Sequence, residues 1–438
     1  MKNKITNKIF DFFVNSNDFN GIPLRQISVE FGIDYKASID LIKELVIENK
    51  ITIQSSTNPH IIGFQKYPID IQIKILDDAK NTKVTKQKMG EITFATESTD
   101  FPICLYPTKQ LLESKRDLTK IRDFPYTLEL SLSEPQLKPI YFEIEALDRY
   151  FNDPRYDFKF EDYSGRISYK YDENDNPIVR EVDKIFIKTF GLGFDSKDNR
   201  VAVVYLRYLN GLTKEHQIFW KSRELNDECR MLKEYYDNTI QGSWTFSYSI
   251  FTGFIGELKL LNDLSVAIFD KPLFSKNFDD ENRPKEFTFF FTPTLKNYHS
   301  FVSLLDKMMS ENINRNFFKD KVELFDIVEI ENNLVERKQK GTIRLLEEWL
   351  QLKFNAENQD ATNEIIFKPF RKVRAERQSP AHKISTNVYD KIYTEKQKDL
   401  IDKSYQSIRA LRHIFQQHRN AKNVTIPDWL ENGEIKVF

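Results

Sequence analysis

The chain is expected to be an α+β protein, and three patterns along the sequence predict this class. Near the N-terminus, apolar residues recur at helical spacing, and a short alternating stretch follows them. From about residue 92 to 225, apolar and polar residues alternate, as they do in strands with one buried face. From residue 248 onward, apolar residues again recur every three or four positions. We therefore expect an N-terminal helical module with a short hairpin, a central and mainly antiparallel β region, and a C-terminal helical bundle.

Length and composition predict several folded domains. The chain has 438 residues, of which 40% are hydrophobic and 30% are charged. This balance supports substantial cores and differs from that of a disordered chain. The formal net charge is -1, so any contact with nucleic acid must come from a local patch.

The cysteines and the N-terminal segment favour a cytoplasmic protein. Cys104 and Cys229 lie far apart and outside any metal-ligand spacing, which argues against a disulfide framework and against a zinc site. The N-terminal segment lacks an uninterrupted apolar stretch, and no segment approaches the about 18 apolar residues of a membrane span. We expect no metal, no cofactor and no membrane association.

Three helices are predicted within residues 3–66. Apolar residues at helical spacing predict the first helix, Pro23 precedes the second, and Gly32 ends it. Asp34 can cap the third helix, whose apolar residues again fall on one face.

Two strands are predicted to follow these helices. Residues 51–56 and 61–65 alternate like the strands of a hairpin, with an Asn-Pro turn between them. Helices and hairpin together resemble a winged helix-turn-helix, which we assign to residues 1–76. The polar stretch 77–91 is predicted to be a linker.

Residues 35–50 would be the DNA-reading helix of such a domain. A groove-reading helix needs a basic surface, whereas this segment mixes three lysines with three acidic residues. We favour a packing or protein-interaction module, and DNA binding by this segment stays as the alternative. The charged residues concerned are Lys36, Lys43, Lys50, Asp40, Glu44 and Glu48.

The central region, residues 90–245, is predicted to be mainly β. Strands are expected at 126–132, 156–171 and 184–209, with turns at Ser164-Gly165 and at other polar clusters. No phosphate-binding loop, zinc-protease motif or α/β-hydrolase motif is present in the sequence.

Two features of the β region invite functional interpretations that we do not favour. Arg155 lies among aromatic residues, and a structural corner explains it better than a base-stacking site does. His216 and Trp220 fall on one helix face, where a packed histidine is more plausible than a catalytic one.

The C-terminal half is predicted to be helical. We divide it into a connecting region, 246–334, and a terminal domain, 335–438. The apolar stripes fall at 254–264, 297–318, 342–354, 365–378 and 394–419.

The segment from Arg377 to His382 contains the candidate catalytic residues. It reads Arg-Gln-Ser-Pro-Ala-His, which is R-x4-H with the polar Gln378 directly after the arginine. The pattern, its flanking helices and its C-terminal place resemble the HEPN superfamily, whose ribonuclease members carry R-x4-6-H in a small helical bundle. The likeness covers roughly 335–438 and is greatest to the Apea-like group of anti-phage proteins. Gln378 replaces a commoner Asn, Asp or His, and Pro380 must bend the helix.

The resemblance implies a metal-independent endoribonuclease. In RNA the 2'-hydroxyl can attack the adjacent phosphate, so the enzyme needs to supply neither a nucleophile nor a metal. His382 would be the general acid or base, because its pKa lies near working pH. Arg377 would hold the phosphate and offset its developing charge, and Gln378 would orient the histidine or contact the phosphate.

Further expectations concern RNA, assembly and regulation. The resemblance implies a homodimer with facing motifs, and a phage-derived or cellular trigger sensed by the N-terminal domains, leading to toxin-type growth arrest or abortive infection. The alternative is a non-catalytic dimeric regulator that binds nucleic acid or protein through the winged helix. Arg412 and His418 fit R-x5-H but are interpreted as surface or dimer-contact residues. The RNA-binding basic cluster is predicted to comprise Arg371, Lys372, Arg374 and Lys383.

Overall fold

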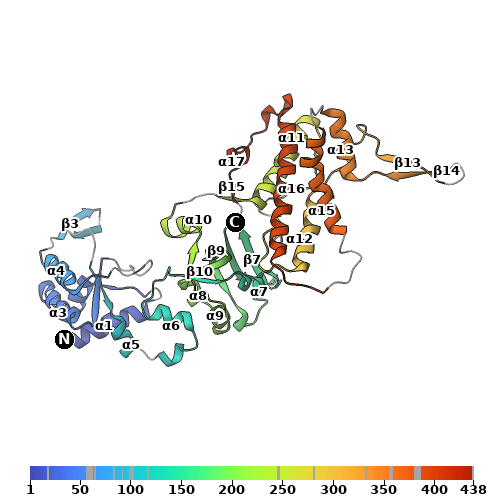
Figure 1. Ribbon diagram of the computed structural model, residues 1–438. Helices are drawn as coiled ribbons and strands as arrows, with labels where there is room; N and C mark the ends of the chain where they lie inside the picture. Colours follow the sequence, from blue (N-terminus) through green and yellow to red (C-terminus); the bar gives the residue numbers. More distant parts are fainter. Residues whose placement is uncertain are drawn as a thin grey trace. The chain divides into compact units, whose positions relative to one another are not determined.

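The computed structural model mixes helices and strands, which confirms the α+β class (Figure 1). By its internal contacts the chain forms two compact units. The first contains Met1–Ala146, Arg155–Asp157 and Arg166–Met231, and the second contains Leu147–Pro154, Phe158–Gly165 and Leu232–Phe438. The structure describes residues 1–16, 19–55, 63, 66–81, 84–90, 92–97, 103–115, 118–243, 247–279, 282–330, 334–354, 359–378 and 386–436.

The three predicted N-terminal helices are present, with the predicted signals at their ends. Gly32 ends the second helix in the left-handed conformation, with φ 60°, which suits a residue without a Cβ. The Asp34 side chain accepts hydrogen bonds from the backbone amides of Lys36 and Ala37 and so caps the third. These helices are α1 (Lys2–Asn15), α2 (Leu24–Phe31) and α3 (Tyr35–Ile47).

The linker predicted at 77–91 is wrong. Residues 77–79 end a fourth helix, α4 (Ile69–Ala79), which packs on α3 and buries Leu76. An antiparallel hairpin follows, formed by β3 (Val84–Met89) and β4 (Ile92–Glu97).

The strand predicted at 51–56 has a partner that the sequence analysis did not predict. β2 (Ile51–Gln54) pairs antiparallel with β5 (Cys104–Pro107), which also pairs with the short β1 (Ile22–Pro23). All but Gly63 of the predicted 61–65 strand lies outside the described residues. Leu105 of β5 joins the same buried core as Ile53, so this module extends beyond the predicted limit at residue 76. The alternating pattern at 51–54 set its strand character, but an apolar segment about fifty residues away supplied the partner.

The central sheet agrees with most of the predicted strands. Its order is β6-β10-β9-β8-β7, and β11 pairs with β9. The register places Ala202 opposite both Phe142 and Leu192, all three of which are buried. The strands are β6 (Pro139–Glu143), β7 (Tyr156–Glu161), β8 (Ser164–Tyr169), β9 (Phe186–Asp195), β10 (Arg200–Tyr205) and β11 (Cys229–Met231).

The strand predicted at 126–132 is instead a helix, α6 (Pro125–Ser131). Pro125 suits a first helical turn, and Tyr126 and Leu130, four residues apart, are both buried. The Gln217 side chain accepts hydrogen bonds from the backbone amides of Tyr126 and Thr127. A contact from nearly a hundred residues away therefore satisfies the free amides at the start of this helix.

Short helices precede, separate and follow the strands of the central sheet along the chain. Ranges are α5 (Lys109–Lys115), η2 (Leu118–Ile121), η3 (Ile144–Leu147), α7 (Asp148–Phe151), η4 (Glu181–Asp183), α8 (Leu206–Asn210), α9 (Lys214–Lys221), α10 (Lys233–Tyr236) and η5 (Asp237–Gln241).

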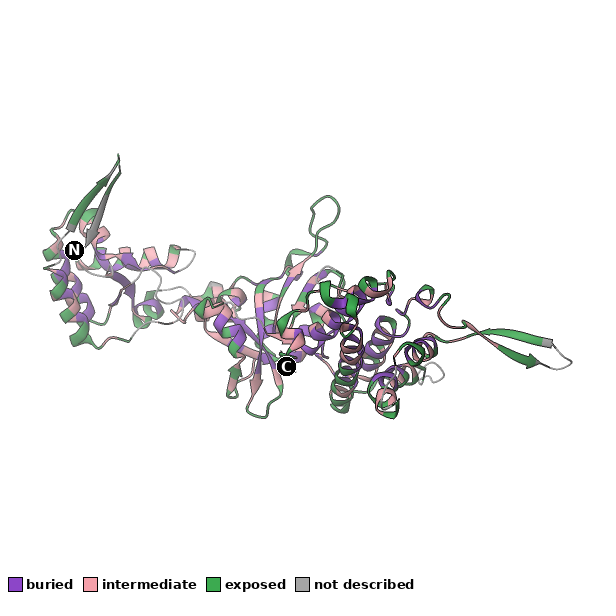
Figure 2. Ribbon diagram, turned by 90° about the horizontal axis from the view of Figure 1, so that it is seen from above, coloured by how far each residue is buried: buried purple, intermediate pink, exposed green. Residues whose placement is uncertain are grey.

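Long helices with purple, buried inner faces make up most of the second unit (Figure 2). α11 packs along α16, and α15 contacts both α12 and α16. The segment predicted as a connecting region, 246–334, is therefore an integral part of the bundle, since it contributes α11 and α12. The ranges are α11 (Ile250–Phe269), α12 (Leu295–Met308), α13 (Thr342–Lys353), α14 (Gln359–Thr362), η7 (Asn363–Phe367), α15 (Lys368–Gln378), α16 (Ile392–Gln416), η9 (Arg419–Asn423) and α17 (Asp428–Glu431).

Smaller elements complete the second unit. β13 (Phe325–Ile330) and β14 (Leu334–Gln339) form an antiparallel hairpin, while β12 (Tyr248–Ser249) and β15 (Ile435–Lys436) pair in parallel. The short helix η6 (Arg315–Phe317) lies between α12 and β13.

Trp349 anchors the core of the bundle. Its ring lies 5.3 Å from that of Phe269 on α11 and 5.8 Å from that of Phe415 on α16, both in near edge-to-face contact. No described helix is long and apolar enough to cross a membrane.

Candidate active site

Arg377 lies in the last turn of α15, where its side chain is 30% exposed. Phe370 and Val373 are buried on the same helix and fix it against its neighbours. Nη1 of Arg377 donates to Oδ2 of Asp306 at 2.6 Å and also to Oε1 of Glu311. The guanidinium is therefore oriented by two carboxylates that the sequence places some seventy residues earlier.

Asp306 is the centre of this arrangement. Its side chain is fully buried on α12, and it also lies 3.3 Å from Nε of Arg374 and accepts a hydrogen bond from the Ser310 hydroxyl. A buried carboxylate requires such partners, because the loss of hydration is otherwise uncompensated. Arg374 completes the network by donating from Nη2 to the Ser310 hydroxyl at 3.0 Å.

The electrostatics of the site keep Arg377 charged. Its hydrogen bonds to Asp306 and then to Glu311 raise the pKa of the guanidinium above its ordinary value. Both of these contacts use Nη1. The guanidinium is thus bonded to both carboxylates through one nitrogen.

The remaining predicted catalytic residues are only partly placed. Gln378 is exposed and is the last residue of α15. His382 and Lys383, together with Pro380, lie outside the described residues. The structure thus places the arginine of the R-x4-H pattern and the glutamine that follows it.

The described members of the predicted basic cluster each pair with a carboxylate of the bundle. Arg371 pairs with Glu347 of α13, and Lys372 pairs with Asp399 of α16 at 2.7 Å. Arg374, as described above, is held by Asp306. The reason is that α15 lies among three helices, each of which presents a carboxylate to it, so these described basic residues act as ties within the bundle.

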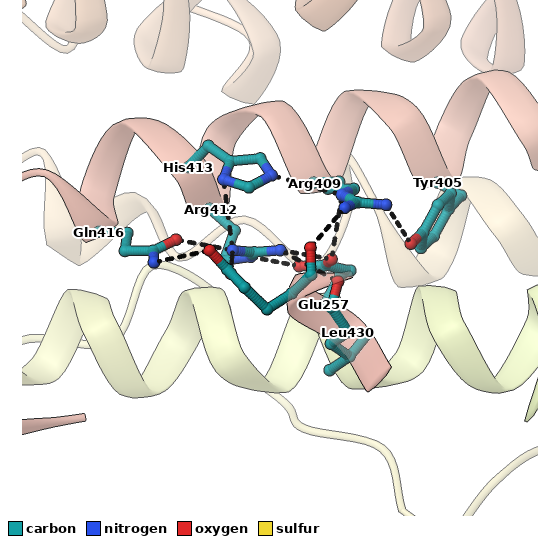
Figure 3. Close-up of polar contacts among 8 residues, drawn as sticks. Glu257, Tyr405, Arg409, Arg412, His413, Gln416 and Leu430 are labelled. Carbon is teal, nitrogen blue, oxygen red and sulfur yellow. Dashed lines mark hydrogen bonds and ion pairs between the residues drawn. The ribbon is translucent and has the colours of Figure 1, made fainter. Parts of the chain in front are cut away.

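A second charged cluster surrounds Arg412 (Figure 3). The surface location predicted for this residue is wrong, because Arg412 is fully buried. Its Nε and Nη2 donate to the two carboxylate oxygens of Glu257 on α11, at 2.8 and 3.0 Å. Its Nη1 donates to Glu431 at 2.6 Å and to Gln416 at 2.7 Å.

His413 lies beside this buried pair. Its ring nitrogens are each 3.3 Å from an arginine, Nε2 from Nε of Arg409 and Nδ1 from Nη1 of Arg412. Burial lowers the pKa of His413 below its ordinary value, and the charges of Arg412 and Arg409 lower it further. His418, the histidine of the R-x5-H pattern, instead accepts a hydrogen bond from the Asn420 amide at the start of η9.

Asp306 and Glu257 were not predicted from the sequence. The helical pattern does contain a signal for buried charged residues, as Asp306 and Arg412 show. Asp306 follows the buried Val302 by four positions, and Arg412 likewise follows Ile408. A charged residue on an apolar helical stripe is seldom buried unless it is paired. Such an interruption indicates a buried ion pair, but it does not identify the partner.

In the first unit, the unfavoured interpretations gain no support. His216 is fully buried and packs edge-on to Tyr156, with ring centroids 6.4 Å apart. Arg155 lies 3.8 Å from the Asp183 carboxylate, and the Tyr156 hydroxyl donates to the Asp183 carbonyl, as expected of a structural corner.

Lysines near the proposed DNA-reading helix also have acidic partners. Lys43 of α3 pairs with Asp77 at 2.7 Å, and Asp40 of α3 pairs with Lys80 at 2.5 Å. These contacts tie α3 to the helix that follows it.

Among the described residues, no group of three or more His, Cys, Asp or Glu side chains is arranged to hold a metal ion. No protein-family model, curated protein or solved structure matches the chain. The functional assignment therefore depends on the residues themselves.

Proposed function

We propose that the chain is a metal-independent endoribonuclease that uses Arg377 and His382, controlled by its N-terminal domains and acting in anti-phage defence or growth arrest. The observation that carries the proposal is the oriented Arg377. A fully buried Asp306 holds one of its nitrogens, and the segment containing His382 begins one residue after Gln378.

Chain geometry supports a shared site. His382 follows Arg377 by five positions, and a segment of that length spans at most about 18 Å even when fully extended. Any bend between the two residues would bring their Cα atoms closer than that limit. Both side chains can then contact one phosphodiester of RNA.

The reaction follows from the chemistry of these groups. The neutral imidazole of His382 takes the proton of a 2'-hydroxyl, whose oxygen then bonds to the adjacent phosphorus. The bond from phosphorus to the 5' oxygen breaks, and that oxygen receives a proton from an acid, giving a cyclic phosphate and a 5'-hydroxyl. Arg377 offsets the charge that accumulates on the non-bridging oxygens during this step.

Purified variants test the proposal directly. His382→Ala and Arg377→Ala should each reduce cleavage of a labelled RNA by about 100-fold or more. His418→Ala is the matched control, since it removes the histidine of the R-x5-H pattern that begins at Arg412 and should leave cleavage intact. Undiminished cleavage by His382→Ala would refute the assignment, as would products that lack a cyclic phosphate or its hydrolysis product.

A second candidate is favoured by the pairing of Arg371, Lys372 and Arg374 with carboxylates of the bundle. In this candidate the bundle only dimerises and the protein is a non-catalytic regulator. Growth arrest that persists in the His382→Ala variant, without any RNA cleavage, would support it over the ribonuclease.

A further inference from the structure

Glu311 is placed differently from the other carboxylate of the candidate site. Its Oε1 contacts Nη1 of Arg377 and lies 3.8 Å from Nη1 of Arg374. Asp306 engages the same two arginines through separate oxygens. A single oxygen of Glu311 therefore lies between two guanidinium groups, a position that also suits a non-bridging oxygen of a phosphodiester.

Exposure separates the roles of the two acids. The Asp306 side chain is 0% exposed, whereas that of Glu311 is 38% exposed. The Glu311 amide donates to the carbonyl of Asp306 at 3.1 Å, which anchors its backbone just beyond the end of α12. An ion pair as exposed as that of Glu311 is weak and readily exchanged, whereas a buried, multiply bonded carboxylate is not.

We infer that Glu311 occupies the phosphate position between Arg374 and Arg377 in the free protein, and that an RNA phosphate must displace it. The inference rests on the proposed function for the identity of the ligand. Asp306 remains in place and continues to orient both arginines after the exchange. Glu311 thus weakens RNA binding by competition and restrains the enzyme until substrate is abundant or the contact is broken.

Binding to an uncleavable RNA tests the inference. The probe is a fluorescent ten-nucleotide RNA, methylated at every 2' oxygen so that it lacks the internal nucleophile, and affinity is measured by anisotropy on the full chain. Glu311→Gln keeps the size of the side chain and removes its charge. This variant should bind about 5-fold more tightly, and the dependence of log affinity on log salt should steepen by about 0.7 for one added phosphate contact.

The matched control is Glu364→Gln. Glu364 is an exposed carboxylate of the same unit that pairs with Lys368 at 2.6 Å and contacts neither site arginine. Its loss changes the net charge equally and should leave affinity unchanged. The gain from Glu311→Gln should also disappear when Arg377→Ala is added. Equal tightening in both single variants, no tightening in Glu311→Gln, or no measurable RNA binding by any variant would overturn the inference.

Cleavage of unmodified RNA separates this inference from the proposed function. Tighter binding by Glu311→Gln without any cleavage would support competition by Glu311 and refute the ribonuclease function. Cleavage by the wild type, with unaltered affinity in Glu311→Gln, would support the ribonuclease function and refute competition by Glu311. Thermal unfolding of each variant verifies that the fold is intact.

Discussion

Arg412 and Glu257 form an ion pair in which both side chains are fully buried, with Nε and Oε2 2.8 Å apart. The pair joins α16 to α11, the two long helices that pack along each other in the second unit. Glu431 adds a second contact to Arg412 from α17, at 2.6 Å. The C-terminal segment and both helices are thus tied to one guanidinium.

Removing one member of this pair should destabilise the second unit strongly. Glu257→Leu leaves the Arg412 charge without its principal acceptor, and we expect a loss of about 3–5 kcal/mol in the free energy of unfolding. The double variant Glu257→Leu/Arg412→Met removes both charges and should recover much of this loss. Urea unfolding of the full chain measures both, and a double variant no more stable than Glu257→Leu would contradict the argument.

The stability of this region should fall in mild acid because of His413. Burial, Arg412 and Arg409 lower its pKa in the folded protein, although Glu431 and Glu257 oppose the shift. The unfolded chain takes up a proton first as pH falls below about 6.5, so the stability contributed by the neutral ring is present above that pH and is lost as pH falls through the folded pKa.

Comparison with His413→Gln isolates this effect. The melting temperature of the wild type should fall more between pH 7.5 and pH 5.5 than that of His413→Gln. His418→Gln, which removes a different histidine of the same unit, should retain the wild-type slope. A His413→Gln variant with an unchanged pH dependence would contradict the prediction.

Asp306 should be required to position Arg377. In Asp306→Asn the arginine loses its fully buried partner, and we expect RNA cleavage to fall by about 10-fold or more, mainly in kcat, because the oriented charge acts in the transition state. Glu311→Gln should not reduce kcat. Equal kcat values for Asp306→Asn and wild type would exclude this positioning role.

Cleavage should persist in EDTA. The proposed mechanism uses the 2'-hydroxyl as nucleophile and needs no metal-bound water. RNA cleavage is measured with and without the chelator, after dialysis. Loss of activity in EDTA that a divalent ion restores would count against the mechanism.

The active protein should be a homodimer, because one His382 cannot be both base and acid in a single step, whereas two facing motifs supply two histidines. Equal mixing of inactive Arg377→Ala and His382→Ala chains should restore part of the cleavage. Analytical ultracentrifugation gives the oligomeric state over the active concentration range. A monomer throughout that range would refute the arrangement and require another proton donor.

Local sequence determined where most elements begin and end. Gly32 and Asp34 lie where a left-handed residue and a side-chain cap are needed, and these preferences act within a few residues. The apolar stripes of the long helices likewise determine which face of each helix is buried. The period-two pattern likewise predicted the strands from 186 to 205, because this alternation also depends on residues that are close in sequence.

Only the tertiary structure decided which segments meet. The segment 126–132 has an ambiguous pattern, and the distant Gln217 stabilises it as a helix. β2 pairs with residues 104–107, and basic residues of α15 pair with carboxylates on three other helices. Spacing along a chain fixes local conformation and the buried face, because those depend on neighbours in sequence. The choice of partner depends on the closure of long loops and on the charge and shape of distant surfaces, which no local pattern contains.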